Sequence, residues 1–135
     1  MTDSLLVDTS VWVALLRGGV PQLTERLAER VSDGSRIVTC EPIAMELLAG
    51  ARPGAQAEVE RLVDGVPSLL VDPGLDFRVA ADLYRRTRAA GRTVRSSMDC
   101  LIAAVATRYD VVLVHHDRDF DALASVCPLR TERWD

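Results

Sequence analysis

The chain has 135 residues, of which 48% are hydrophobic and 27% charged, a composition that fits one globular domain with a sizeable core. No stretch approaches the roughly 20 apolar residues that span a bilayer, and no signal pattern opens the sequence, so we predict a single cytoplasmic domain over residues 1–135. The net charge of −4 counts against indiscriminate binding to nucleic acid. All 16 basic residues are arginines, which excludes any mechanism that needs a catalytic lysine.

Short apolar runs alternate with amphipathic segments along the whole chain, which predicts strands and helices in turn. In chain order we predict a strand at 4–7, helices at 9–16 and 21–31, a strand at 37–39, helices at 42–49 and 55–64, a strand at 69–71, helices at 75–90 and 96–109, a strand at 111–114, a helix at 119–124 and an edge strand at 129–131. This alternation indicates an α/β fold with a mostly parallel sheet covered by helices on both faces. We place Trp12 in the core and Trp134 in a tail or contact region.

Four acidic residues occupy positions that would bring them to the carboxyl edge of the predicted sheet. Asp8 and Asp117 each follow an apolar strand, Asp99 begins a helix, and Glu46 interrupts an otherwise apolar helix. Carboxylates brought together repel one another and raise each other's pKa, so a cation has to neutralise them. Oxygen ligands alone suit Mg²⁺ or Mn²⁺, and we therefore predict a divalent-metal site at the carboxyl edge of the sheet.

Each of these acids also has an ordinary structural explanation. Asp8 and Asp117 could cap the helices that follow them. Asp99 stands three residues after Ser96, so this pair could form a capping box. Glu46 could be a solvated residue at the border of a buried face. The ordered set of four favours the metal site over these separate explanations.

The segment around the last acid holds further candidates. His115 and His116 are adjacent strand residues that point to opposite faces, so both cannot easily serve one site, and we expect packing or hydrogen-bonding roles for them. We place Asp119 and Asp121 on the solvated start of the last helix, with Asp119 as a candidate supporting residue of the metal site.

The acidic motifs, taken in order, resemble those of PIN-domain proteins and, more narrowly, those of VapC toxins from bacterial type II toxin–antitoxin pairs. The matching segments are Val7-Asp8-Thr9-Ser10-Val11-Trp12, Pro42-Ile43-Ala44-Met45-Glu46-Leu47, Asp99 with Leu101-Ile102-Ala103-Ala104, and Asp117-Arg118-Asp119-Phe120. The resemblance covers essentially the whole chain. Each motif alone is weak, but the ordered set is specific.

This resemblance implies a three-layer α/β/α fold, endoribonuclease activity that depends on Mg²⁺ or Mn²⁺, inhibition by a VapB-type antitoxin, and a homodimer. By position it assigns catalysis and metal binding to Asp8, Glu46, Asp99 and Asp117, with Asp8 and Asp99 as the most direct ligands and with Glu46 and Asp117 acting directly or through water. Ser10 would orient the ligands. Relatives usually carry Thr or Ser where this chain has His115, which puts the usual hydroxyl contact in question.

We therefore predict an RNA-cleaving toxin in which a metal-activated water attacks a phosphodiester and leaves a 5′-phosphate and a 3′-hydroxyl. The arginines expected to contact the RNA backbone are Arg92, Arg95, Arg88 and Arg118. A solvated surface or an antitoxin contact would equally explain these arginines. Two rival functions are an inactive PIN-like module that only binds a protein and a signalling domain phosphorylated on aspartate, which normally needs a lysine.

Overall fold

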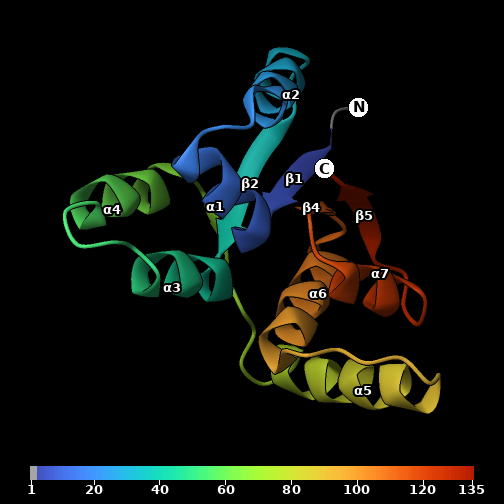
Figure 1. The fold of residues 1–135 in the computed structure, drawn as a ribbon. Coiled ribbons are helices and arrows are strands. Elements are labelled where there is room, and N and C mark those ends of the chain that lie inside the picture. The colour runs from blue at the N-terminus through green and yellow to red at the C-terminus, as the bar shows by residue number, and fades with distance from the viewer. Residues whose placement is uncertain (1–2) are drawn as a thin grey trace.

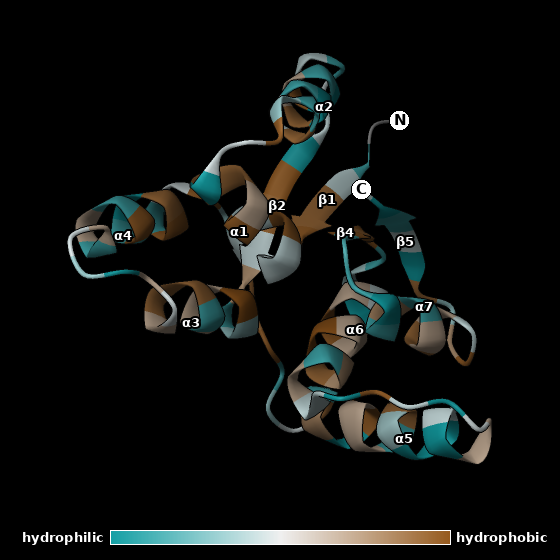
Figure 2. Cartoon of the chain, in the orientation of Figure 1, coloured by the Kyte–Doolittle hydropathy of each residue, from teal (hydrophilic) through white to brown (hydrophobic). Residues whose placement is uncertain are grey.

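A computed structural model describes residues 3–135 and contains a single five-stranded sheet in the order β3-β2-β1-β4-β5, with every neighbouring pair parallel. The strands, in chain order, are β1 (Ser4–Val7), β2 (Arg36–Cys40), β3 (Ser68–Leu69), β4 (Val112–His115) and β5 (Arg130–Arg133). The sheet is thus entirely rather than mostly parallel. Figure 2 shows that β1 and β2 are hydrophobic over most of their length, as expected for strands covered on both faces.

Seven helices fill the connections between the strands. They are α1 (Thr9–Arg17), α2 (Pro21–Ser32), α3 (Glu41–Ala49), α4 (Gln56–Gly65), α5 (Asp76–Ala89), α6 (Ser97–Tyr109) and α7 (Arg118–Ala124). From β1 to β3 the chain moves toward one edge of the sheet, and from β3 to β5 it moves toward the other. Because crossovers between parallel strands are right-handed, the two directions place α1–α4 on one face of the sheet and α5–α7 on the other. Figure 1 shows these two groups on either side of the strands. The predicted α/β/α arrangement is confirmed.

The strand order reverses between β1 and β4, at the centre of the sheet. In open α/β sheets this reversal separates the loops that leave the two strands and opens a crevice at their carboxyl ends. Asp8 directly follows β1, and Asp117 is the second residue after the end of β4. The fold therefore positions both predicted site residues at the crevice.

The third strand is shorter than predicted because side chains replace its sheet partners. Only Ser68 and Leu69 pair with β2. Beyond them, the Leu70 carbonyl accepts a hydrogen bond from Arg108 Nη2 at 2.7 Å, and the Val71 amide donates to the Glu41 carboxylate at 2.6 Å. Such side-chain contacts between distant residues leave no trace in a local sequence pattern.

The prediction for Trp134 is wrong, because this side chain is completely buried, whereas Trp12 lies in the core as predicted. The Trp134 amide donates to the His115 carbonyl at 2.8 Å, which extends the pairing of β5 with β4 by one residue. Arg26 of α2 lies over the indole ring, 4.9 Å from its centroid. The end of the chain therefore belongs to the packed core. Among residues 3–135, no helix has the length and apolar character needed to cross a membrane.

Candidate metal centre

Asp8 combines its predicted capping role with a place in the site. Its Oδ2 accepts hydrogen bonds from the Ser10 amide at 3.0 Å and from the Ser10 hydroxyl at 2.6 Å, and so caps α1. The Ser10 hydroxyl in turn accepts from the His116 amide at 3.0 Å. Ser10 thereby connects the end of β1 to the end of β4 and fixes the carboxylate of Asp8, which is only 4% exposed.

Glu46 reaches the same region from α3. Its Oε1 accepts a hydrogen bond from the Thr9 hydroxyl at 2.8 Å, and its side chain is partly buried. The charge of Asp8 and burial both raise the pKa of Glu46, with burial as the larger cause. The explanation of Glu46 as a solvated border residue is therefore wrong. Thr9 is a contact that the sequence analysis missed, since nothing local links a hydroxyl to a glutamate 37 residues away.

Asp99 does not form the alternative capping box. Ser96 caps α6 by accepting from the Met98 amide at 3.2 Å, but the Asp99 carboxylate receives no hydrogen bond from the described residues. Burial, followed by the negative charges of Asp8, Asp117, Asp119 and Glu46, raises the pKa of Asp99 to about 8. A buried carboxylate without hydrogen-bond donors and surrounded by like charges has the environment of a cation ligand.

Asp117 and Asp119 complete the centre at the start of α7. Asp117 Oδ1 accepts from the Asp119 amide at 3.0 Å and caps the helix. Asp119 is 2% exposed, so its predicted place on a solvated surface is wrong. One carboxylate oxygen from each of Asp99, Asp117 and Asp119 lies within 4.8 Å of the other two. The structure thus gives Asp119 a more central position than the supporting role predicted for it.

Arg95 is the arginine that reaches these acids. Its Nη2 lies 3.2 Å from Asp117 Oδ1, and its backbone amide and Nε donate to Asp119 Oδ2 at 3.1 and 3.4 Å. The guanidinium therefore offsets part of the negative charge and orients both carboxylates from outside. Arg95 contacts only one carboxylate oxygen of each of these two residues.

The other predicted RNA contacts lie apart from the acids. Arg88 and Arg92 line a shallow hollow near the C-terminal end of α5, where Arg88 lies over the Tyr84 ring at 5.8 Å. Arg118 is exposed on the first turn of α7 and has no ion-pair partner within residues 3–135. The structure thus brings Arg95 into the centre and leaves Arg88, Arg92 and Arg118 to the surrounding surface.

His115 makes a hydrogen bond to the backbone at the start of α7. Its Nδ1 accepts from the Asp117 amide at 3.1 Å, and its side chain is fully buried. Burial lowers the pKa of His115, so the imidazole stays neutral and Nδ1 keeps its lone pair. His116 is half-exposed and points elsewhere, toward Asp135, as the alternation along a strand predicts.

Taken together, five carboxylates from four connections of the sheet converge on one crevice, and no lysine is present to neutralise them. Their buried oxygens fit a hard divalent cation, which prefers carboxylate ligands. An open parallel sheet with such a centre at its switch point is typical of α/β proteins that bind ligands at the carboxyl ends of their strands, and a divalent cation held there can assist phosphoryl transfer.

Comparison with known proteins narrows this class. A family model described as PIN domain matches residues 5–126. VapC ribonuclease Mb1587 from Mycobacterium bovis is 48% identical over 131 residues, which cover 93% of this chain and 96% of the relative. Ribonuclease VapC19 from Mycobacterium tuberculosis is 36% identical over 109 residues, covering 81% and 85%. The chain therefore belongs to the PIN-domain family, within the VapC ribonucleases.

Solved structures agree with this assignment at the level of the fold. DNA-bound VapBC from Salmonella typhimurium aligns over 100% of both chains with a TM-score of 0.76 and 21% identity. Mycobacterium tuberculosis VapC20, described as a sarcin–ricin loop cleaving toxin, aligns over 94% of this chain and 99% of its own with a TM-score of 0.67 and 23% identity.

Proposed function

We propose that residues 1–135 form one PIN domain that acts as a metal-dependent endoribonuclease, the toxin of a type II toxin–antitoxin pair held inactive by a VapB-type antitoxin. The observation that carries the proposal is the convergence of Asp8, Glu46, Asp99, Asp117 and Asp119 at the switch point of the sheet. The VapC ribonucleases among its relatives, and the VapBC complexes among its structural neighbours, support the activity and the partner.

Asp99 and Asp117, with Asp8 and Glu46 directly or through water, would hold Mg²⁺ or Mn²⁺. The ion supplies Lewis-acid stabilisation of phosphoryl charge and acidifies a water molecule. Ser10 keeps the Asp8 carboxylate in place, Thr9 does the same for Glu46, and Arg95 orients Asp117 and Asp119. Exposed arginines beside the crevice, among them Arg118, Arg92 and Arg88, would contact the RNA backbone.

The test compares wild type with Asp99→Asn on total cellular RNA, with Mg²⁺, with Mn²⁺ and with a chelator. We expect discrete fragments with 5′-phosphate ends from wild type plus metal, and a loss of cleavage of at least about a hundredfold in the variant, because Asp99 lies at the centre of the acids. Circular dichroism checks that the variant is folded. Metal-independent cleavage, or full activity of Asp99→Asn, would contradict the proposal.

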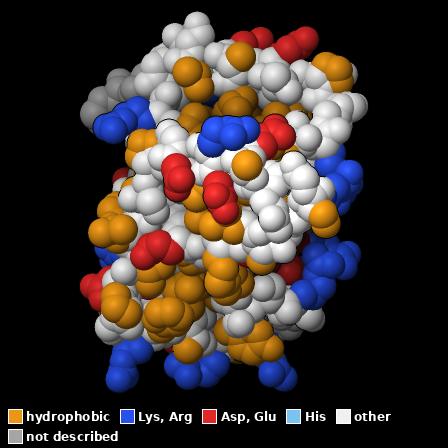
Figure 3. Space-filling view, turned by 90° about the vertical axis from the view of Figure 1, so that its left-hand side faces the viewer, with side chains coloured by type: hydrophobic (Ala, Val, Ile, Leu, Met, Phe, Trp, Pro, Cys, Tyr) orange, Lys and Arg blue, Asp and Glu red, His pale blue; other side chains and the backbone are white. Residues whose placement is uncertain are grey.

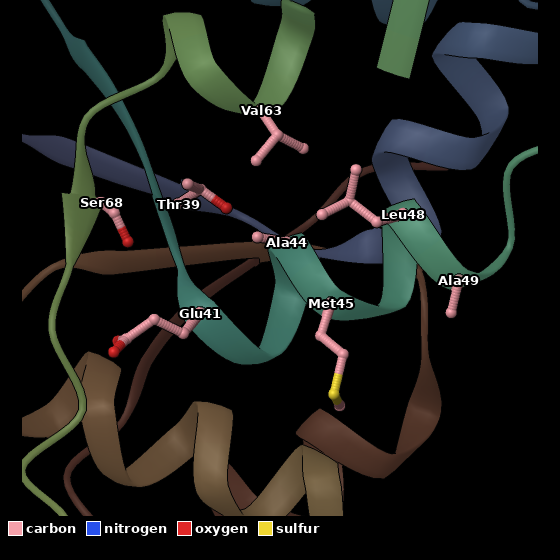
Figure 4. A pocket seen from close by; sticks show the side chains of 8 residues that line it. All are labelled: Thr39, Glu41, Ala44, Met45, Leu48, Ala49, Val63 and Ser68. Atoms are coloured by element: carbon pink, nitrogen blue, oxygen red, sulfur yellow. The ribbon is translucent and has the colours of Figure 1, made fainter. Parts of the chain in front are cut away.

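We also propose that the protein forms a homodimer through an apolar band on α3, α5 and α6. A hollow between α3, α4 and the strands is lined by Thr39, Glu41, Ala44, Met45, Leu48, Ala49, Val63 and Ser68 (Figure 4). A neighbouring hollow shares Met45 and continues to Phe77 and Met98. Figure 3 shows the α3 and α4 side of the molecule, where hydrophobic side chains gather in the lower part of the view. Exposed apolar side chains gathered on one face are typical of interfaces.

Phe77 is 55% exposed within this band, so Phe77→Glu is expected to place a charge in the proposed interface. The dimer should weaken by at least about 30-fold, the effect of an interface hot spot. Light scattering after gel filtration measures the mass over a dilution series. Val31→Glu, at an exposed apolar position on α2, is the control and should leave the mass unchanged. A monomeric wild type, or a dimer that survives Phe77→Glu, would contradict this interface.

A further inference from the structure

A small cavity lies directly beside the acids, between α1, α3 and the start of α4. Its volume is about 270 Å³. Val13, Leu47 and Val59 give it apolar walls, Glu58 adds a carboxylate, and the 41% exposed side chain of Leu16 also lines it. This volume falls just below the roughly 300 Å³ at which small-molecule sites begin, so the cavity has room for one group of a ligand rather than for a whole ligand.

Glu46 connects the cavity to the metal centre. This glutamate lines the cavity, and its Oε1 is held by the Thr9 hydroxyl at the start of α1. Its charge also acts on Asp99. Glu46 therefore belongs both to the acidic centre and to the lining of the cavity.

Two arginines flank this cavity and are free to bind an anion. Arg17, the last residue of α1, and Arg52, in the loop before α4, both line it. Neither makes an ion pair or a side-chain hydrogen bond with any of residues 3–135, in contrast to Arg95, which is bound to two aspartates. Two carboxylates, Glu46 and Glu58, also line the cavity, so its lining is mixed. Apolar side chains beside two unpaired guanidinium groups offer contacts for a base and for the phosphates next to it.

We propose that this cavity is a nucleotide subsite: it takes the base next to the cleaved phosphodiester, while Arg17 and Arg52 hold the neighbouring phosphates. The proposal rests on the ribonuclease function and extends it, because it names where the single-stranded substrate lies beyond the metal centre. It also assigns backbone binding to two arginines of α1 and the α3–α4 loop, in addition to those proposed above.

The test measures RNA binding without cleavage, in an Asp99→Asn background, by fluorescence anisotropy of a short single-stranded RNA of mixed sequence. We expect Arg17→Ala combined with Arg52→Ala to weaken binding about tenfold or more. The slope of log affinity against log salt should shrink by about 1.4, since each single-strand phosphate contact contributes about 0.7. Arg78→Ala combined with Arg61→Ala, two exposed arginines that do not line the cavity, makes the same charge change and should have little effect.

A second arm separates a base slot from phosphate contacts alone. Abasic nucleotides are placed one at a time around the mapped cleavage position, and one of them should weaken binding by about fivefold or more. Equal RNA affinity of the two double variants, or no effect of any abasic nucleotide, overturns the subsite and would leave the cavity to an antitoxin segment. Cleavage is assayed separately. If wild type cuts RNA and the arginine variants bind RNA normally, the subsite is contradicted and the ribonuclease function is not.

Discussion

Asp99→Asn is expected to stabilise the metal-free protein at pH 8 while it removes the stabilisation that metal provides. Asp99 has a pKa of about 8 because it is buried among four other carboxylates, whereas in the unfolded chain its pKa is near 3.8. Between these two values the folded state binds a proton that the unfolded state has released. The free energy of unfolding therefore falls as the pH rises through this window.

The stability that the neutral Asp99 carboxyl contributes is complete below about pH 4 and is lost as the pH approaches 8. Asparagine keeps the shape of the side chain and has no charge to bury, so the variant should lack this component of the pH dependence. In chelator at pH 8 we expect its melting temperature to exceed that of wild type by at least about 4 °C, which corresponds to about 1 kcal/mol for a chain of this length.

In the presence of metal, the melting temperature of wild type should exceed that of Asp99→Asn. A divalent cation displaces the proton from Asp99, so the affinity of wild type for Mn²⁺ should rise with pH up to about 8. Thermal melts from pH 5 to 8, with Mn²⁺ and with chelator, measure both effects. Glu41→Gln is the matched control, because Glu41 binds the Val71 amide on the surface and takes no part in the acidic centre. Parallel pH profiles for wild type and Asp99→Asn in chelator would refute the assigned environment.

The position of the site was predictable because it depends on strand ends, which are strongly marked in the sequence. The apolar runs that become β1 and β4 each lead into an acid, and parallel pairing brings those ends to one edge. Glu46 and Asp99 were predicted from a different signal, because each is an acidic residue within an otherwise apolar helix. Periodicity and topology together predicted that these four acids lie close to one another, as they do in the structure.

What the sequence could not show are contacts between side chains far apart in the chain. Asp119 reads as an ordinary first-turn acid of a helix, and only the approach of Arg95 from the loop before α6 explains its burial. The stopping point of β3 depends on Arg108, almost 40 residues away. The one available signal for Asp119 was its spacing of two residues from Asp117, which is the spacing of a capped helix start.

Trp134 is the largest such omission, and its replacement by alanine should be among the most destabilising changes in the chain. The segment before it, Arg130–Arg133, is polar, and the predicted edge strand reached only residue 131. In the fold, Trp134 Nε1 donates to Glu132 Oε1 at 3.3 Å, and Glu132 is bound to Arg30 of α2 at 2.6 Å. The indole thus connects the edge strand β5 to α2. The backbone amide of Trp134 binds the carbonyl of His115, at the end of β4 from which the chain enters the site.

Removing a fully buried tryptophan should lower the free energy of unfolding by about 3–5 kcal/mol, a large share of the roughly 5–15 kcal/mol that stabilises a typical domain. Urea titration followed by circular dichroism measures the change. Trp134→Phe keeps an aromatic ring for Arg26 and should lose only about 1–2 kcal/mol, while Arg133→Ala alters an exposed ion-pair residue and should lose less than about 1 kcal/mol. Equal stability of Trp134→Ala and Arg133→Ala would mean that β5 does not dock in solution, and the carboxyl end of β4 would then lose the support that holds Asp117 beside Asp99.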